Sequence, residues 1–268
     1  MTEAKFTNRR PLRLPIIGTI LAIAITTIMD ATGLVAFSAL PLLPLLVVFW
    51  YIEHHSRRSM GFAWGRLPHY TMAVLFAIVV MGILAVISAV AGVWDLSKTN
   101  WEKAALNIAL IAVSTILVAV VTEEGFFRGW LWASLEKAGQ KKRRILLWTS
   151  VAFASWHLSA VLLKTGFDLP ASQIPLFIIN VAIIGGVWGL LRELSGSIIV
   201  SSVSHGVWNG LAYVLFGYGT KSGALGIKNT ALYGPEVGLL GLVLNLCFLL
   251  LLLRLFRGTQ IRNLKSEI

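Results

Sequence analysis

Charge is scarce in this sequence of 268 residues: 13% are charged, whereas a soluble domain of this length carries about a quarter. Apolar residues make up 57%, and the mean hydropathy is +0.79. So little polar surface cannot cover a water-soluble globule. The single cysteine, Cys247, has no partner, which excludes an intrachain disulfide framework. The composition instead predicts an all-α, polytopic membrane protein.

Eight apolar segments, each close to the roughly 20 residues that cross a bilayer, predict eight transmembrane helices. They lie at about 15–29, 34–52, 70–93, 104–135, 145–163, 174–191, 196–216 and 237–256. The sequence has no internal repeat and no soluble insertion, so residues 1–268 are predicted to form a single transmembrane domain. No cleavage pattern clearly follows the first segment, which we expect to be a retained span.

The distribution of lysine and arginine predicts the orientation. With the N-terminus in the cytosol, 17 of these residues lie on the cytosolic side and five on the other, which favours cytosolic N- and C-termini. The five are Lys98, Lys103, Lys164, Lys221 and Lys228. The formal net charge of +11 is therefore explained by topology, and no nucleic-acid partner is expected. We expect a multi-pass protein of the plasma (inner) membrane.

Three charged side chains interrupt the fourth apolar segment: Glu123, Glu124 and Arg128. Because a charge within a bilayer costs at least a few kcal/mol, intramembrane ionisable residues are candidates for a functional site. Residues four apart share a helix face, so Glu124 and Arg128 are expected to pair. Glu123 is turned about 100° away from that pair and is free to face a cavity.

Two histidines and an asparagine stand out in the fifth and seventh segments, namely His157, His205 and Asn209. Counted at about 1.5 Å per residue from the nearest cytosolic charge, Glu123, His157 and His205 lie at roughly 21, 20 and 18 Å. Similar depth on three helices predicts one polar site within the membrane. Four-residue spacing also places Asn209 on the same stripe as His205.

These residue types suit peptide hydrolysis. A carboxylate can act as general base toward water, and an imidazole can orient that water. The other imidazole and the Asn209 amide can donate hydrogen bonds to a tetrahedral oxyanion. Glu123, His157 and His205 can equally bind zinc, because a catalytic zinc site uses the same side chains. The sequence leaves both mechanisms open, so the expected cofactor is either none or zinc.

The pattern Glu123-Glu124-x-x-x-Arg128, Phe153-x-x-x-His157 and His205-x-x-x-Asn209 resembles the signature of the CAAX-processing and bacteriocin-processing (CPBP) intramembrane proteases. The resemblance covers about residues 121–210, within a predicted catalytic core of about 104–217. It implies that Glu123 is the catalytic base and that His157 helps to activate water. It also implies that His205 and Asn209 form the oxyanion hole, braced by Glu124 and Arg128.

One departure from the family pattern is Gly125, where a bulkier apolar residue is expected; it predicts looser helix packing beside Glu123. The resemblance implies a membrane-associated peptide or protein substrate cut near its C-terminal end, without implying that the substrate is prenylated. A non-enzymatic scaffold, immunity or regulatory protein of the same architecture is the main alternative. A proton-coupled transporter is a third, although it predicts internal repeats that the sequence does not show.

Overall fold

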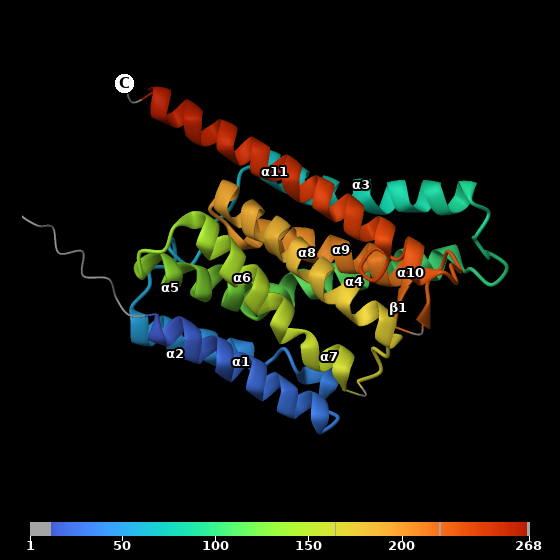
Figure 1. Cartoon of the computed structure of the whole chain (residues 1–268), viewed down its shortest axis with the longest axis horizontal. Helices are drawn as coiled ribbons and strands as arrows, with labels where there is room; N and C mark the ends of the chain where they lie inside the picture. The colour runs from blue at the N-terminus through green and yellow to red at the C-terminus, as the bar shows by residue number, and fades with distance from the viewer. Residues whose placement is uncertain (1–11, 164, 220, 267–268) are drawn as a thin grey trace, which may run out of the picture.

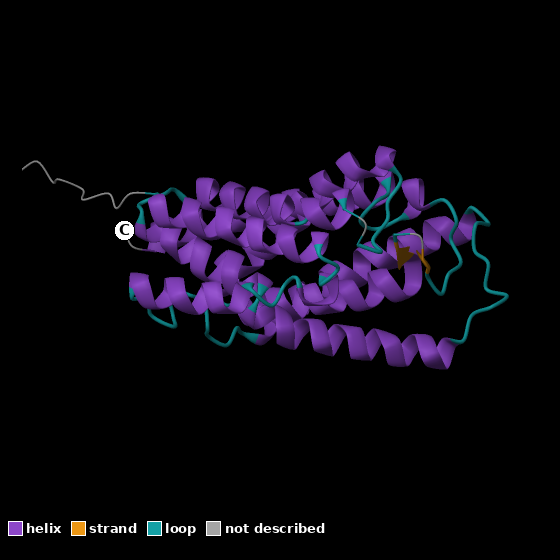
Figure 2. Cartoon of the chain, turned by 90° about the horizontal axis from the view of Figure 1, so that it is seen from below, coloured by secondary structure: helices purple, strands orange, loops and turns teal. Residues whose placement is uncertain are grey.

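The computed structural model describes residues 12–163, 165–219 and 221–266 and is a bundle of long helices (Figure 1). Eight helical stretches among these residues are long and apolar enough to cross a membrane, which confirms the number predicted. The helices run along the long axis of the molecule, and a two-residue strand pair lies near one end (Figure 2). The predicted cytosolic cations Lys5, Arg9 and Arg10, and Lys164 on the other side, lie outside the described residues.

The α-helices are α1 (Arg13–Ala31), α2 (Leu42–Glu53), α3 (Leu67–Val90), α4 (Trp101–Val121), α5 (Trp132–Lys137), α6 (Lys142–Trp156), α7 (Leu158–Leu162), α8 (Ile174–Ser195), α9 (Ile198–Leu211), α10 (Thr230–Tyr233) and α11 (Leu239–Ser266). Four further helical segments connect them. Two are 3₁₀-helices, η1 (Val35–Phe37) and η3 (Ala171–Gln173), and two are π-helices, η2 (Glu124–Leu131) and η4 (Ala212–Phe216). The strands β1 (Gly217–Tyr218) and β2 (Lys221–Ser222) pair antiparallel.

Small residues bring α9 against α4. A Cβ on Gly210 would lie 2.7 Å from the Ile108 carbonyl oxygen, and one on Gly206 would collide with the Ala112 carbonyl oxygen. Only glycine therefore allows this separation of the two backbones, and small residues four apart are a common means of close packing between membrane helices. His205 precedes the first of these glycines, so the close contact also fixes how deeply its imidazole lies against α4.

Helix α1 braces the junction between α6 and α7. The Trp156 indole donates to the Thr26 hydroxyl at 2.8 Å, and the Ser159 hydroxyl donates to Asp30 at 2.6 Å. These two bonds flank His157, which lies between α6 and α7 in the chain. Polar contacts between helices hold this junction in place although the surrounding solvent is lipid.

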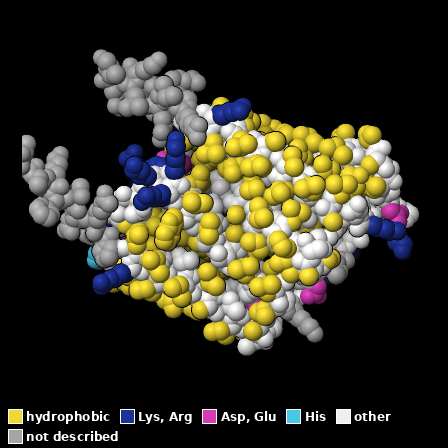
Figure 3. Space-filling view, viewed as in Figure 1, with side chains coloured by type: hydrophobic (Ala, Val, Ile, Leu, Met, Phe, Trp, Pro, Cys, Tyr) yellow, Lys and Arg dark blue, Asp and Glu magenta, His cyan; other side chains and the backbone are white. Residues whose placement is uncertain are grey.

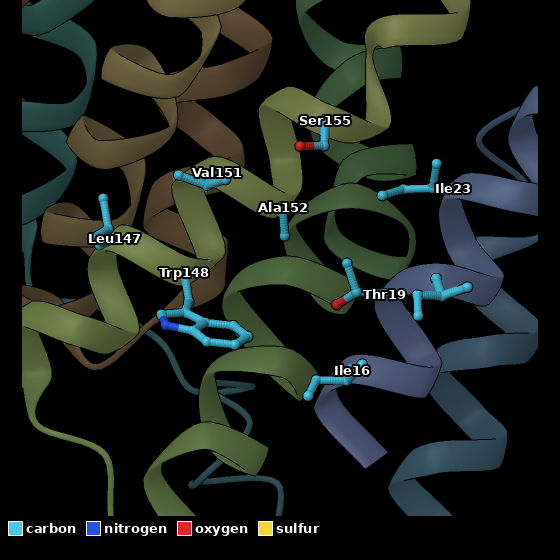
Figure 4. Close-up of a pocket in the computed structure, with 9 residues that line it drawn as sticks. Ile16, Thr19, Ile23, Leu147, Trp148, Val151, Ala152 and Ser155 are labelled. Atoms are coloured by element: carbon cyan, nitrogen blue, oxygen red, sulfur yellow. The ribbon is translucent and has the colours of Figure 1, made fainter. Parts of the chain in front are cut away.

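Beside this brace, α1 and α6 enclose a groove of about 410 Å³ (Figure 4). Its walls are apolar apart from Thr19 and Ser155, and the Thr19 hydroxyl is already bonded to the Pro15 carbonyl oxygen at 2.8 Å. The groove therefore offers surface for an acyl chain and little to recognise a polar group.

Hydrophobic side chains cover the middle of the molecule, while lysine and arginine gather toward its two ends (Figure 3). Tryptophans near the ends of membrane segments often lie among the lipid headgroups, but Trp130 and Trp132 are 0% and 1% exposed. The Trp130 indole donates to Glu53 at 2.7 Å and the Trp132 indole to Glu136 at 3.0 Å. These internal acceptors replace the headgroups as partners for the two indole N–H groups.

Candidate active site

The fourth membrane segment changes its helix type at the acidic pair. Helix α4 ends at Val121, and Thr122 has non-helical backbone angles of φ −112° and ψ −99°. Residues Glu124–Leu131 then form a π-helix, a rare conformation that frequently occurs at functional sites. The sequence predicts one continuous helix here, so the break at Thr122 is a correction.

Gly125 is required by this break, and the expectation of loose packing beside Glu123 was wrong. A Cβ on Gly125 would lie 2.5 Å from the Val120 carbonyl oxygen and 2.9 Å from a methyl carbon of Leu46. The backbone thus folds back so closely that no side chain fits. The glycine tightens the contact between the π-helix and α2.

Glu124 and Arg128 form the predicted ion pair, with Oε1 and Nη1 3.3 Å apart and both side chains fully buried. The guanidinium also donates to the Gly185 carbonyl oxygen at 3.0 Å and lies 4.1 Å from the ring centroid of Phe153. Arginine can serve all three partners because its planar fork presents several N–H groups and an apolar face. The pair therefore fastens the π-helix to α6 and α8.

His205 lies between the two carboxylates. Its Nδ1 is 3.2 Å from Glu124 Oε1, and its Nε2 is 3.8 Å from Glu123 Oε2. The ring stacks on Trp188 with centroids 3.9 Å apart. A single imidazole therefore contacts both acids, whereas the sequence predicts separate surroundings for them. With a protonated imidazole, the formal charges of His205, both glutamates and Arg128 sum to zero.

The other two predicted residues lie close to this group without contacting it directly. Nδ1 of His157 bonds to the Phe153 carbonyl oxygen at 2.9 Å, which leaves Nε2 without a hydrogen-bond partner among the described residues. The Phe153 ring lies 4.5 Å from His157 and 6.3 Å from His205, centroid to centroid. Asn209 follows one turn after His205, and its half-buried amide makes no hydrogen bond within the described residues.

Residues 105–211 match a family model described as Rce1-like, type II CAAX prenyl endopeptidase Rce1-like. The matched segment is about two fifths of the chain, and over it the sequence is similar to the Rce1-like family. The match agrees with the resemblance seen in the motifs and supports a membrane endopeptidase in general. Comparison with curated proteins finds no match, and comparison with solved structures finds none either.

The Rce1-like segment contains all six predicted site residues but ends before a further carboxyl beside them, that of Glu236. Trp208, next to Asn209, donates its indole N–H to Glu236 Oε1 at 2.8 Å. Burial raises the pKa of the Glu236 carboxyl to about 7, and His205 lies near enough to act on it electrostatically. The sequence gives no signal for this residue, because it lies in a loop far from the motifs.

Two buried asparagines hold the backbone that carries Glu236. Asn180 donates to the carbonyl oxygens of Pro235 and Glu236, each at 2.9 Å. Asn245 donates to the Asn180 side-chain oxygen at 2.9 Å and to the Pro235 carbonyl oxygen at 3.2 Å. Both asparagines are 0% exposed, so α8 and α11 hold this loop beside the candidate active site.

The three candidate zinc ligands, Glu123, His157 and His205, are not gathered at one point in this structure. A catalytic zinc needs three protein ligands that converge on one point. Among the described residues, no group of three or more His, Cys, Asp or Glu side chains does so. Glu123 Oε2 and His205 Nε2 lie 3.8 Å apart. The Phe153 ring packs edge-on beside both histidines, with its centroid 4.5 Å from that of His157 and 6.3 Å from that of His205.

Proposed function

We propose that the protein is an intramembrane endopeptidase that hydrolyses a peptide bond of a membrane-associated substrate near its C-terminal end. The observation that carries the proposal is the contact of Glu123 with His205. Glu123 is the one partly exposed member of the buried charged group, with 17% of its side chain accessible. An accessible carboxylate beside an anchored imidazole is an arrangement able to activate water.

Glu123 acts as the general base in this proposal. It accepts a proton from the water that attacks the scissile carbonyl carbon, and the same proton then passes to the leaving amine. Glu124 cannot take this role readily, because its side chain is fully buried and engaged by Arg128 and His205. The two adjacent glutamates thus have separate tasks, one reactive and one structural.

His205 and Asn209 stabilise the tetrahedral intermediate. The Nδ1–H of His205 donates to Glu124, so an imidazolium has its second N–H, at Nε2, available for a developing oxyanion beside Glu123. The Asn209 amide is a second donor from the same helix face. The free Nε2 of His157, at the junction of α6 and α7, orients the attacking water.

The experiment is cleavage of a fluorogenic peptide with a prenylated C-terminal CAAX sequence, and of its unprenylated twin, by purified protein in lipid nanodiscs. Removing a general base lowers the rate by about 10²–10⁴-fold, so Glu123→Gln should lose nearly all cleavage. His205→Ala and Asn209→Ala should lose about 10²–10³-fold, the usual effect of removing an oxyanion donor. Glu102→Gln is the matched control, because it removes an exposed carboxylate from the same membrane segment.

Full cleavage by Glu123→Gln with either peptide would refute the mechanism. A cellular phenotype that survives Glu123→Gln would favour the non-enzymatic scaffold instead. The same assay addresses the metal: loss of cleavage with a chelator, restored by zinc at one ion per chain, would contradict a mechanism that assigns no step to metal.

A further inference from the structure

A polar hollow lies at the end of the bundle opposite the C-terminus, where the loop between α3 and α4 meets the loop after β2 (Figure 1). It has a volume of about 850 Å³, within the range of small-molecule sites. Three lysines, Lys98, Lys103 and Lys228, line it together with Asn100 and Asn107. These are three of the five cations predicted for the extracytosolic side, gathered around one cavity.

Hydrogen bonds hold the two walls of this lysine basin together. The Asp95 backbone N–H donates to the Leu225 carbonyl oxygen at 3.1 Å, and the Thr99 hydroxyl donates to the Ala224 carbonyl oxygen at 2.6 Å. Gly226, with φ +63°, packs so closely on the Asp95 backbone that a Cβ would collide with it. The two loops that form the basin are therefore held together by hydrogen bonds and close backbone packing.

The charge of the lysine basin is not balanced within the described part of the chain. None of its three ammonium groups has a carboxylate within 4.0 Å there. Asp95 also lines the basin, where hydrogen bonds from Ser97, helped by the charges of Lys228 and Lys98, lower the pKa of its carboxyl. Asp95 is thus ionised at neutral pH, and the basin keeps a net charge of +2.

The α4 helix directs the choice of ligand. Its N-terminus opens at the basin, where the helix dipole favours an anion; the Asn100 side chain already accepts from the Lys103 backbone N–H at 2.8 Å. Along α4 below Lys103 runs a stripe of lipid-facing side chains, each 55–67% exposed: Leu106, Leu110, Val113 and Leu117. A free anion would use only the basin, whereas a phospholipid would use the basin for its phosphate and the stripe for an acyl chain.

We propose that the lysine basin binds the headgroup of an anionic phospholipid, with the phosphate between Lys98, Lys103 and Lys228 and an acyl chain along α4. Asn107, one turn after Lys103, also lines the cavity and in this proposal donates to the ester or glycerol oxygens. Glu123 lies 16 residues further along the segment, roughly 24 Å away, so this site is separate from the catalytic group.

The experiment is native mass spectrometry of the detergent-purified full chain with phosphatidylglycerol and phosphatidylcholine of identical acyl chains. We expect selective retention of phosphatidylglycerol. Each lysine near a lipid surface contributes about fivefold in binding, so Lys228→Gln should weaken retention by about that factor. The triple Lys98→Gln, Lys103→Gln, Lys228→Gln variant should weaken it by on the order of a hundredfold.

Lys221→Gln is the matched control. It removes one cation from the same side, but the Lys221 ammonium donates to the Tyr218 hydroxyl at 2.7 Å and does not line the basin. Equal retention of the two lipids would overturn the proposal, as would equal effects of Lys221→Gln and Lys228→Gln. Displacement of the bound lipid by inorganic phosphate alone would identify a free-anion site and overturn it too. Because lipid binding is measured without a peptide, the outcome is independent of the proposed peptidase activity.

Discussion

The buried Glu236 carboxyl makes the free energy of unfolding of this protein depend on pH. Its pKa is about 7 in the folded protein, compared with an ordinary value of 4.5. Between these two pH values the folded state holds a proton that the unfolded state has released. Stability therefore falls as pH rises from about 4.5 to 7 and is constant above that range. A difference of 2.5 pH units corresponds to about 3 kcal/mol.

Glu236→Gln removes this effect with little change of shape. The Gln carbonyl oxygen can still accept from the Trp208 indole, which now donates to Glu236 at 2.8 Å. The variant should match the wild type near pH 4 and exceed its free energy of unfolding by about 3 kcal/mol at pH 8. Denaturant titration in detergent micelles at intervals from pH 4 to 8 measures the difference between the two proteins.

The pH dependence of that difference is the decisive quantity. An unpaired Gln N–H would add an offset of about 1–3 kcal/mol that does not vary with pH. The exposed Glu102→Gln substitution is the control and should give a nearly constant difference across the range. A difference for Glu236→Gln that stays constant, or that falls as pH rises, would refute the account of a carboxyl buried beside Trp208.

Two further predictions concern the π-helix. Arg128→Ala should lower the free energy of unfolding by about 3–5 kcal/mol, because it leaves Glu124 charged, buried and without its cation. Arg128→Lys should recover only part of this loss, since one ammonium cannot match the fork that serves Glu124 and Gly185 together; full recovery in denaturant titration would contradict this. Gly125→Ala should destabilise by about 1–3 kcal/mol through overpacking. The control Gly82→Ala, which has open space in α3, should stabilise by up to about 1 kcal/mol; equal effects of the two substitutions would argue against the close backbone approach.

Hydropathy and helix periodicity predicted the features of the fold that depend on nearest neighbours along the chain. The eight membrane segments follow from length and composition alone. The pairing of Glu124 with Arg128 survives the change from α- to π-helix, because the two side chains still lie on one side of the segment. Gly206 and Gly210 have the four-residue spacing that permits close approach of membrane helices, but the spacing does not name α4 as the partner.

Features that depend on contacts between distant parts of the chain could not be predicted from the sequence. At the break at Thr122 the π-helix packs against α2, and the periodicity of the sequence does not predict that contact. Glu236 reaches the site because Asn180 and Asn245, which lie 65 residues apart in the sequence, hold its loop. From the sequence, those asparagines are typical of polar contacts between helices, and nothing shows which loop they hold. The predicted catalytic roles of Glu123, His157, His205 and Asn209 stay predictions, because geometry alone does not test them.

The contacts around α9 explain why the proposed site needs no substrate to assemble it. Gly206 sets the distance of α9 from α4, and the stack of Trp188 on His205 fixes the plane of the imidazole. Trp208, also on α9, donates a hydrogen bond to Glu236. These restraints come from three different elements, α4, α8 and the loop before α11, so a rotation of α9 would break at least one of them. Donors held in place before the reaction avoid the cost of reorganisation when charge develops. Mobility needed to admit a peptide must therefore lie in the elements that do not hold His205.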